Sequence, residues 1–163
     1  MIQLITANKG DLFRVQNILE QTPTYHLNVG GRKAMPNAAE LLFETVPQKK
    51  LPEDKLVLIV REGLDDVGIV DLIHGYPNLE TAFLGFLAII EGKQNSGIGK
   101  ATYLEVEKLV KEVGLKKIRL SVVGTNPVDA FWEKMGFHFT GETKDYRNKK
   151  VHSISKLMEK ELT

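Results

Sequence analysis

The sequence is organised around Gln94-Asn95-Ser96-Gly97-Ile98-Gly99-Lys100-Ala101. An apolar run over 82–90 precedes this stretch, and residues 101–113 repeat apolar side chains at helical spacing. This order predicts a strand, a loop of small residues and the start of a helix. Gly97 and Gly99 lack a Cβ atom, so the backbone can approach a ligand closely. Because the N–H groups at a helix start have no intrahelical acceptor, the loop favours an anion such as phosphate.

The composition is that of one globular domain. The chain has 163 residues, of which 42% are hydrophobic and 26% are charged, close to the averages for such proteins. The formal net charge of +1 provides no overall field that would attract nucleic acid or an anionic membrane. The absence of cysteine excludes disulfides, thiolate metal ligands and cysteine nucleophiles. We expect a single domain over residues 1–163, with no metal ion and no nucleic-acid or membrane partner.

The N-terminus favours a cytoplasmic location. Met1-Ile2-Gln3-Leu4 lacks the basic region and long apolar run of a signal peptide. The longest apolar stretch, 82–90, is too short to cross a bilayer. We therefore expect a cytoplasmic protein, and the sequence leaves both a monomer and a homodimer open.

The first third of the chain predicts alternating strands and helices. Residues 2–6 alternate in polarity as a short strand does, and Asn8 is placed to cap a helix that runs to about Glu20. We expect residues 25–34 to be irregular, because two glycines lie in their middle. A second helix should begin at Pro36-Asn37.

Three strands are then predicted to form an antiparallel meander over 56–61, 67–74 and 82–90. Asp65-Asp66 is assigned to the turn between the first two strands. Tyr76-Pro77-Asn78 supplies the turn between the last two.

The chain after the loop predicts a helix, a strand, a short helix and a closing hairpin. Gly114 is a good helix terminator, and residues 118–123 read as a strand. Asn126-Pro127 should begin the short helix, which ends at Gly136. The hairpin is expected over 137–146 and 151–157.

Two common nucleotide-binding patterns are absent from the glycine loop. The Walker pattern requires Ser or Thr after Gly-Lys, but Ala101 follows Gly99-Lys100. The dinucleotide fingerprint requires three glycines across six positions early in a βαβ unit, and no such run occurs. An unrelated phosphate-binding domain and a plain strand–helix turn remain alternatives at this point.

Two stretches resemble motifs of the GNAT superfamily of N-acyltransferases. Gln94-x-x-Gly97-x-Gly99 resembles its acyl-CoA pyrophosphate loop, and residues 83–90 look like its fourth strand. Residues 126–137 are similar to its Asn…Phe-Tyr/Trp-Glu-Lys-x-Gly-Phe helix. They read Asn-Pro-Val-Asp-Ala-Phe-Trp-Glu-Lys-Met-Gly-Phe. The order of elements agrees across essentially the whole chain. The resemblance implies an α/β fold whose mixed sheet of about seven strands is splayed between the fourth and fifth strands and flanked by helices on both faces.

The resemblance implies an N-acetyltransferase that moves an acetyl group from acetyl-CoA to a primary amine by direct attack in a ternary complex. The acceptor would be a small molecule or a peptide. Pantetheine would pair with exposed backbone of the fourth strand, and the pyrophosphate would lie on the N–H groups of the loop. The cofactor-binding residues predicted in this way are Leu87, Ala88, Ile89, Gln94, Asn95, Ser96, Gly97, Ile98, Gly99, Lys100, Asn126 and Trp132.

The chain departs from the family pattern at three positions. Trp132 stands where the family often has a tyrosine acid, and an indole supplies no acidic proton. Phe83 stands where many members have a glutamate. Asn126 is one residue closer to Trp132 than usual, and capping of the short helix is an equally good interpretation of it. These departures keep open a GNAT-like domain that binds acyl-CoA without turnover.

Three residues are candidates for a catalytic base. Asp71 lies in an otherwise apolar strand, where an unpaired carboxylate is expensive to bury. It could bind a cationic substrate amine, pair with a surface lysine or lie on a solvated edge. His74 ends that strand and can accept a proton near neutral pH. Glu80 precedes the fourth strand and could reach the cleft mouth. His74 and Glu80 could equally face solvent, and positioning of a neutral amine needs no base.

Four residues are candidates for binding the acceptor. Tyr25, His26 and Arg32 fall between the first two predicted helices, a segment that lines the acceptor side in the family. Long irregular segments often carry function. Tyr76 is the fourth candidate. The alternatives are surface charge for Arg32 and packing within its own turn for Tyr76.

Overall fold

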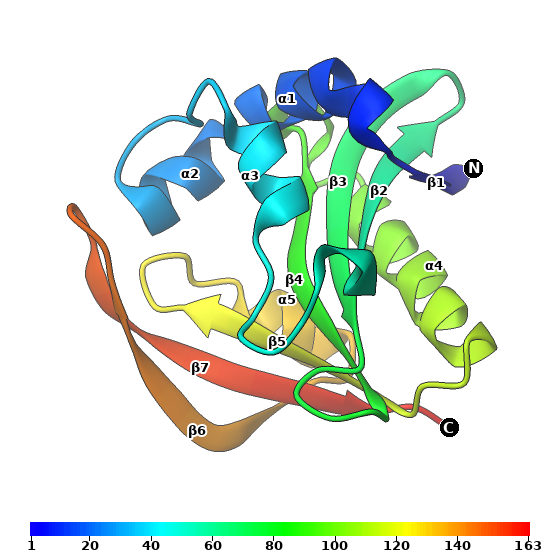
Figure 1. The fold of residues 1–163 in the computed structure, drawn as a ribbon, viewed down its shortest axis with the longest axis vertical. Helices are drawn as coiled ribbons and strands as arrows, with labels where there is room; N and C mark the ends of the chain where they lie inside the picture. The colour runs from blue at the N-terminus through cyan, green and yellow to red at the C-terminus, as the bar shows by residue number, and fades with distance from the viewer.

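A seven-stranded mixed sheet runs through the molecule (Figure 1). The computed structural model describes residues 1–163. The sheet order is β1-β2-β3-β4-β5-β7-β6, and the β4–β5 pair is parallel whereas the other neighbours are antiparallel. The strands are β1 (Ile2–Thr6), β2 (Lys55–Glu62), β3 (Asp65–His74), β4 (Thr81–Ile89), β5 (Lys117–Val123), β6 (His138–Arg147) and β7 (His152–Glu161).

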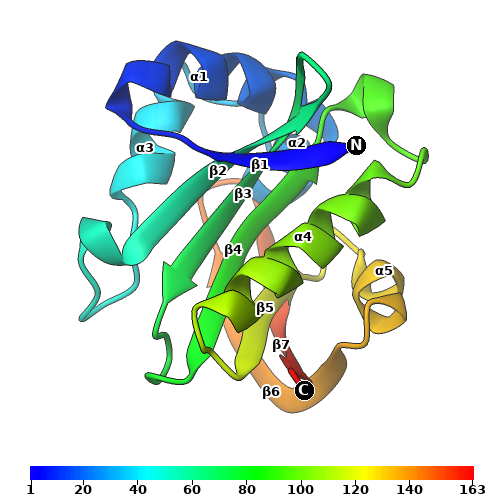
Figure 2. The ribbon, with the colours of Figure 1, turned by 90° about the vertical axis from the view of Figure 1, so that its right-hand side faces the viewer.

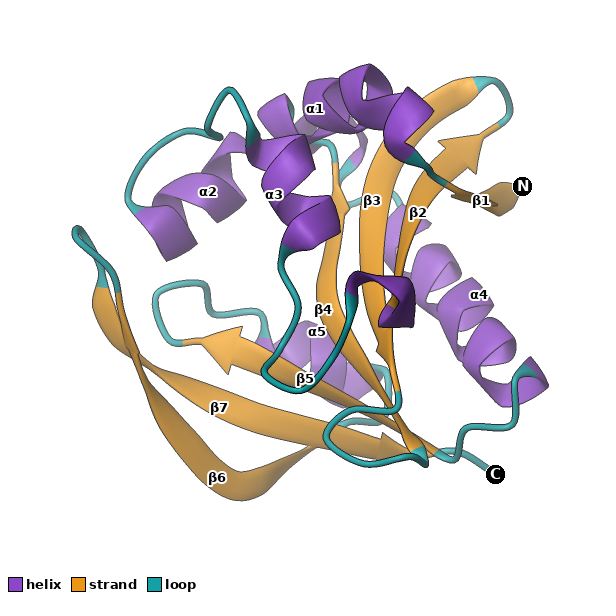
Figure 3. Cartoon of the chain, in the orientation of Figure 1, coloured by secondary structure: helices purple, strands orange, loops and turns teal.

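Helices cover both faces of the sheet (Figures 2 and 3), as predicted. α1 and α3 lie on one face, and α4 and α5 lie on the other. No helix combines the length and the apolar character needed to cross a membrane. The helices are α1 (Leu12–Glu20), α2 (Pro23–Gly30), α3 (Ala38–Glu44), α4 (Ile98–Glu112) and α5 (Asp129–Lys134), with short 3₁₀ turns η1 (Lys9–Asp11), η2 (Pro52–Asp54) and η3 (Glu91–Lys93).

Strand β2 explains why both faces need a helical layer. Successive strand residues point to opposite faces, and Val57 and Ile59 pack toward α1 and α3. Leu58 and Val60 pack toward α4 on the opposite face. All four side chains are at most 3% exposed, so apolar surface is buried on both sides of the same strand.

The sheet splays between β4 and β5, which confirms the predicted fold class. The two strands pair only through Thr81, Ala82 and Phe83 of β4, and they then diverge (Figure 1). Across β3, Leu72 faces Leu84 and Asp71 faces Phe86, so Gly85 is an extra residue on β4. A β-bulge of this kind bends its strand and increases the local twist. The bulge therefore lies just beyond the point where β4 leaves β5.

The expectation of an irregular segment over 25–34 is wrong, because Pro23–Gly30 forms α2. Proline is pre-organised for the first helical position. Gly31 ends the helix at φ +73°, so the two glycines terminate a helix instead of interrupting a loop. Contacts to distant segments hold α2: the Thr24 N–H donates to Glu91 Oε1 at 3.0 Å, and Thr125 Oγ1 donates to the Asn28 carbonyl at 2.6 Å.

The predicted turn at Asp65-Asp66 is also wrong, because both residues belong to β3. The turn lies at Gly63-Leu64, where Gly63 has φ +62°. Asp66 stays in the strand because the Arg14 guanidinium donates to both of its carboxylate oxygens, at 3.0 and 2.9 Å. A bidentate partner of this kind stabilises the carboxylate.

The burial of α4 predicts a difference between two substitutions on one helix. Val106 is fully buried and Leu104 is 50% exposed. Val106→Ala should lower the free energy of unfolding by about 2 kcal/mol, because two methyl groups leave a packed core. Leu104→Ala should change it by less than about 0.5 kcal/mol. Urea denaturation at constant m-value measures both, and equal losses would contradict the packing described.

Candidate active site

The loop before α4 presents a row of free amide groups. The backbone N–H groups of residues 95–100 donate to no backbone or side-chain acceptor in the protein. Asn95 at φ +61° and Gly97 at φ +84° turn the chain into the helix. Ser96 Oγ donates to the Lys93 carbonyl at 2.6 Å, which holds the turn. These donors at a helix N-terminus suit a diphosphate, so the residues fit the phosphate group of a CoA thioester.

The strand leading to this loop has an open backbone edge. The Ile90 N–H donates to the Val67 carbonyl of β3, and the Ala88 carbonyl points to Gly68 on the same side. Because alternate residues of a strand turn their backbone groups to opposite sides, Leu87 and Ile89 face the side that β5 has left. Gln94 Nε2 donates to the Ile89 carbonyl at 2.9 Å. Ala88 is thus engaged with β3, and the free N–H groups are those of Leu87 and Ile89.

Trp132 lies in an aromatic cluster between α4 and α5. Its indole makes edge contacts with the rings of Tyr103, Phe131 and Phe137, at centroid distances of 5.7, 4.9 and 5.4 Å. Only 7% of Trp132 is exposed. Trp132 packs α5 against α4, the helix that the glycine loop opens, and its ring carries no ionisable group.

The capping interpretation of Asn126 is wrong. α5 begins at Asp129, and its N-cap residue Val128 makes no side-chain cap bond. The Asn126 side chain instead accepts a hydrogen bond from Asn28 Nδ2 at 3.3 Å. Asn126 thus ties the β5–α5 loop to α2.

A first cavity of about 870 Å³ opens on the face of the sheet that carries α1 and α3. Its walls come from α2, α3, β4 and the tip of the β6–β7 hairpin. Phe83, Gly85 and Phe86 of β4 line it, so it reaches the residues where β4 and β5 separate. Three predicted acceptor residues, Tyr25, His26 and Arg32, line this cavity, and so does one predicted base, Asp71.

Asp71 is paired with a lysine that the sequence analysis did not single out. Lys55 Nζ lies 3.0 Å from Asp71 Oδ2, and the two side chains are 3% and 9% exposed. Lys55 also donates to the Leu42 carbonyl at 2.6 Å. Asp71 Oδ1 has no hydrogen-bond partner. The site therefore holds a carboxylate with one oxygen engaged and one oxygen free.

Burial controls the protonation of Asp71. Desolvation raises the pKa of the carboxyl group to about 6, and the neighbouring Lys55 ammonium opposes this rise. A Cβ atom on Gly85 would lie 3.0 Å from Asp71 Oδ2, so the bulge glycine makes room for the carboxylate. At neutral pH the group is mostly ionised and able to accept a proton.

Aromatic side chains from α2 and β4 form a wall of the cavity. The ring of Tyr25 meets that of Phe86 edge-on at 4.6 Å and that of His26 at 5.4 Å. Burial raises the pKa of Tyr25 to about 12 and lowers the pKa of His26. Both side chains are therefore neutral at pH 7, and this wall is uncharged.

The other two predicted bases lie outside the first cavity. His74 is an exposed residue at the end of β3. Glu80 is 70% exposed and lies 3.7 Å from Lys116 Nζ. Asp71 does pair with a lysine, but Lys55 is buried and is not the surface lysine that the sequence analysis considered. His74 and Glu80 face solvent.

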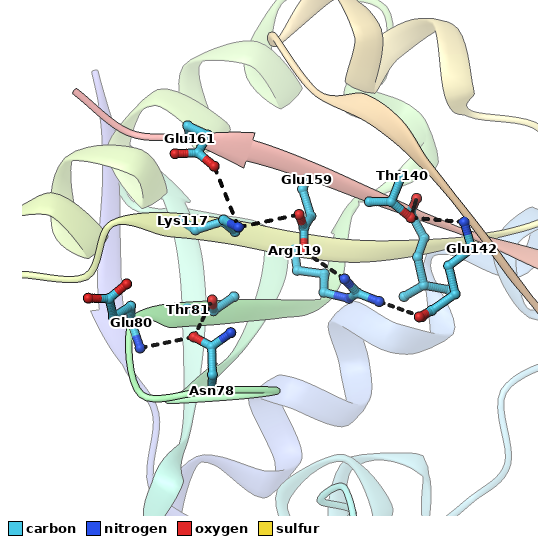
Figure 4. Close-up of polar contacts among 10 residues, drawn as sticks. Asn78, Glu80, Thr81, Lys117, Arg119, Thr140, Glu142, Glu159 and Glu161 are labelled. Atoms are coloured by element: carbon cyan, nitrogen blue, oxygen red, sulfur yellow. Dashed lines mark hydrogen bonds and ion pairs between the residues drawn. The ribbon is translucent and has the colours of Figure 1, made fainter.

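A second cavity of about 500 Å³ lies beyond Phe83, which lines both cavities. Tyr76 lines it and meets the Phe83 ring edge-on at 5.4 Å. Figure 4 shows Arg119 of β5 between two carboxylates: it donates to Glu159 and to Glu142, each at 2.6 Å. This network ties β5, β6 and β7 together beside the last β4–β5 pair.

The sequence analysis missed several residues of the first cavity. Gly85 carried a signal, because a glycine inside an apolar strand often marks a bulge. Lys55 gave a weaker signal in the sequence, because it is a charged residue at the start of an apolar strand. Lys149 and Lys150 carried none, since they were part of the predicted hairpin turn and only the fold brings them to α2.

Comparisons with known proteins agree with this geometry. Residues 22–137 match the model of the Acetyltransferase (GNAT) family. An acetyltransferase from Thermus thermophilus superposes with a TM-score of 0.79 and 20% identity, over 99% of this chain and 97% of that chain. The ribosomal-protein-S18-alanine N-acetyltransferase from Escherichia coli gives 0.74 and 15%, over 100% and 95% of the two chains.

A spermidine N-acetyltransferase from Vibrio cholerae, solved in complex with CoA and spermine, gives a TM-score of 0.74 and 17% identity over 98% of this chain and 95% of that chain. No curated protein matches the sequence significantly. At these identities the solved structures show a shared fold. The family model, however, spans most of the chain and includes both the glycine loop and the Trp132 helix. The chain therefore belongs to the GNAT family of acetyltransferases.

Proposed function

We propose that this protein is an acetyl-CoA-dependent N-acetyltransferase that takes its amine acceptor into the first cavity. The observation that carries the proposal is the position of Asp71. Asp71 lines the cavity, its buried Oδ1 has no hydrogen-bond partner, and it lies directly across from Phe86 on β4. The cavity thus meets the diverging edge of β4, where a thioester held by the strand would be attacked.

The backbone supplies the cofactor contacts in this proposal. The pyrophosphate lies on the N–H groups of residues 95–100, and the pantetheine amides pair with Leu87 and Ile89. An N–H group on the same edge of β4 donates a hydrogen bond that stabilises the charge developing on the thioester oxygen. Acetyl-CoA supplies the activated acetyl group. Trp132 contributes packing that holds α4 against α5.

Asp71 acts as the base in this proposal. The amine nitrogen attacks the carbonyl carbon, the C–N bond forms, and the C–S bond breaks. The proton that leaves the nitrogen passes through one water molecule to the Asp71 carboxylate. The CoA thiolate departs and takes a proton from solvent, since Trp132 has none to donate. His74 and Glu80 have no part in the transfer.

One observation favours a second candidate, a domain that binds acyl-CoA without turnover. Trp132 occupies the position of the family's tyrosine acid and is packed in the core. A thiol-release assay over a panel of amines separates the two functions. Acetyl-CoA binding without thiol release for any amine would support the binding domain.

The first prediction here concerns the glycine loop. Gly97 at φ +84° and Gly114 at φ +86° lie at opposite ends of α4, and nothing lies within 4 Å of a Cβ atom on either. A valine at either position should cost about 1–3 kcal/mol of stability, because β-branched residues are strained at positive φ. Only Gly97→Val should weaken acetyl-CoA binding, by about tenfold or more, since it reorients the free amides.

Calorimetric titration of acetyl-CoA into both folded variants measures this difference. Gly114→Val is the matched control, because it introduces the same strain away from the loop. Equal acetyl-CoA affinity in the two variants would remove the loop from the cofactor site.

The second prediction concerns Asp71 and pH. In the wild type, kcat/KM should rise with a midpoint near pH 6, the pKa of Asp71 in the free protein. Asp71→Asn should lower kcat/KM by about a hundredfold and abolish this ascending limb. His74→Ala and Glu80→Gln should remain near wild type. A profile that follows the pKa of each amine tried, with Asp71→Asn as active as wild type, would show that Asp71 is not the base.

A stability measurement provides a readout independent of activity. Because the pKa of Asp71 is higher in the folded than in the unfolded chain, the folded state binds the proton more tightly. Its stabilising contribution is therefore complete below about pH 4 and is lost as the pH rises through 6, a change of about 3 kcal/mol. Asp71→Asn should lack this fall. If the unpaired Lys55 prevents folding, Lys55→Met/Asp71→Asn provides the same comparison.

A further inference from the structure

Four cationic side chains gather at the mouth of the first cavity. Arg32 and Lys33 follow α2, and Lys149 and Lys150 form the tip of the β6–β7 hairpin. All four are exposed and all four line the cavity. Figure 1 shows the hairpin tip rising on the same side of the molecule as α2, although more than a hundred residues separate them in sequence.

Specific contacts hold the two segments together. The Tyr146 hydroxyl and Asn148 Nδ2 both donate to the Val29 carbonyl, each at 2.9 Å. Lys150 packs closely over Gly31, where a Cβ atom would lie 2.5 Å from the Lys150 Cβ. These hydrogen bonds and this packing are part of the fold, and they bring the four cations to the same cavity.

None of the four cations has a carboxylate partner. Their side-chain nitrogens make no ion pair or hydrogen bond within the protein, whereas Arg119 beside the second cavity bridges two carboxylates (Figure 4). The only acidic residue lining the first cavity is Asp71, and Lys55 neutralises it. The cavity mouth therefore carries four uncompensated positive charges, on a chain whose formal net charge is only +1.

We infer that the acceptor is an amine that also carries an anionic group, a carboxylate or a phosphate. This inference rests on the proposed function. With the amine at Asp71 and the β4 edge, the anion extends outward to Arg32, Lys33, Lys149 and Lys150. Like charges at a cavity mouth repel one another and attract an anion into the site. The same field opposes entry of a polyamine, whose second ammonium would meet the four cations.

Acceptors matched in length test this inference. Pentylamine, cadaverine and δ-aminovalerate all have five carbons and differ at the carbon farthest from the reacting amine, which is a methyl, a methylene that carries an ammonium, and a carboxylate. Ethanolamine and O-phosphoethanolamine provide the phosphate comparison. We expect kcat/KM for one of the anionic acceptors to exceed that of its uncharged match by about tenfold or more, with cadaverine the poorest of its series. The advantage should shrink with added salt. The two comparisons identify which anion the site prefers.

Two variants of equal charge assign the effect to the cavity mouth. Lys149→Gln/Lys150→Gln should reduce the advantage of the anionic acceptor by about tenfold. Lys9→Gln/Lys108→Gln removes two exposed, unpaired lysines far from the cavity and should retain the advantage. Circular dichroism verifies that both variants are folded.

The failure of this inference and of the proposed function are distinguishable. Acetylation that favours cadaverine, or an anion preference equal in the two double variants, would overturn the inference and leave the acetyltransferase intact. Absence of acetylation with every amine would overturn the proposed function. In that case, calorimetric titration of δ-aminovalerate and of cadaverine into the CoA complex would still test the inference. Tighter binding of δ-aminovalerate would support it. Tighter binding of cadaverine would contradict it.

Discussion

The separation of β4 from β5 is the constraint on which the rest of the site depends. Parallel pairing stops at Phe83, and the bulge at Gly85 bends β4 two residues later. Before this point β4 is an ordinary interior strand, and after it β4 has a free edge. The Arg119 network secures β5, β6 and β7 beside the last pair. Both the proposed cofactor edge and the proposed acceptor cavity lie at this local change in pairing.

The buried pair of Lys55 and Asp71 links the fold to the proposed chemistry. Removing a carboxylate from water is costly, and an ion pair recovers only part of this cost. Because desolvation of the carboxylate is not fully offset by Lys55, the pKa of Asp71 is raised to about 6. A stronger set of partners would keep the carboxylate ionised but would occupy the oxygen that an amine needs. The single lysine therefore leaves a carboxylate that is both charged at neutral pH and free to accept a proton.

Helix α2 shows where local sequence patterns mislead. Its glycines suggested a loop, yet Glu91, Thr125 and the hairpin tip anchor it along its length. These partners are distant in sequence, so no window of residues contains the signal. The same helix supplies Tyr25 and His26 to the cavity wall and brings Arg32 toward Lys149. The contacts of this helix with the hairpin tip also bring Lys149 and Lys150, which the sequence analysis missed, to the first cavity.

The sequence by itself determined the parts that depend on local chemistry. Apolar alternation specified the strands, and the glycines of residues 94–101 specified a tight entry into α4 with free amides, because only backbone conformation is involved. The family motifs followed from the same residues. Only the tertiary structure decided that Asp71 pairs with Lys55, that Trp132 packs in the core, and that His74 and Glu80 face solvent. It also decided that four unpaired cations converge at one cavity, because burial, pairing and electrostatic potential arise from residues that meet only when the chain has folded.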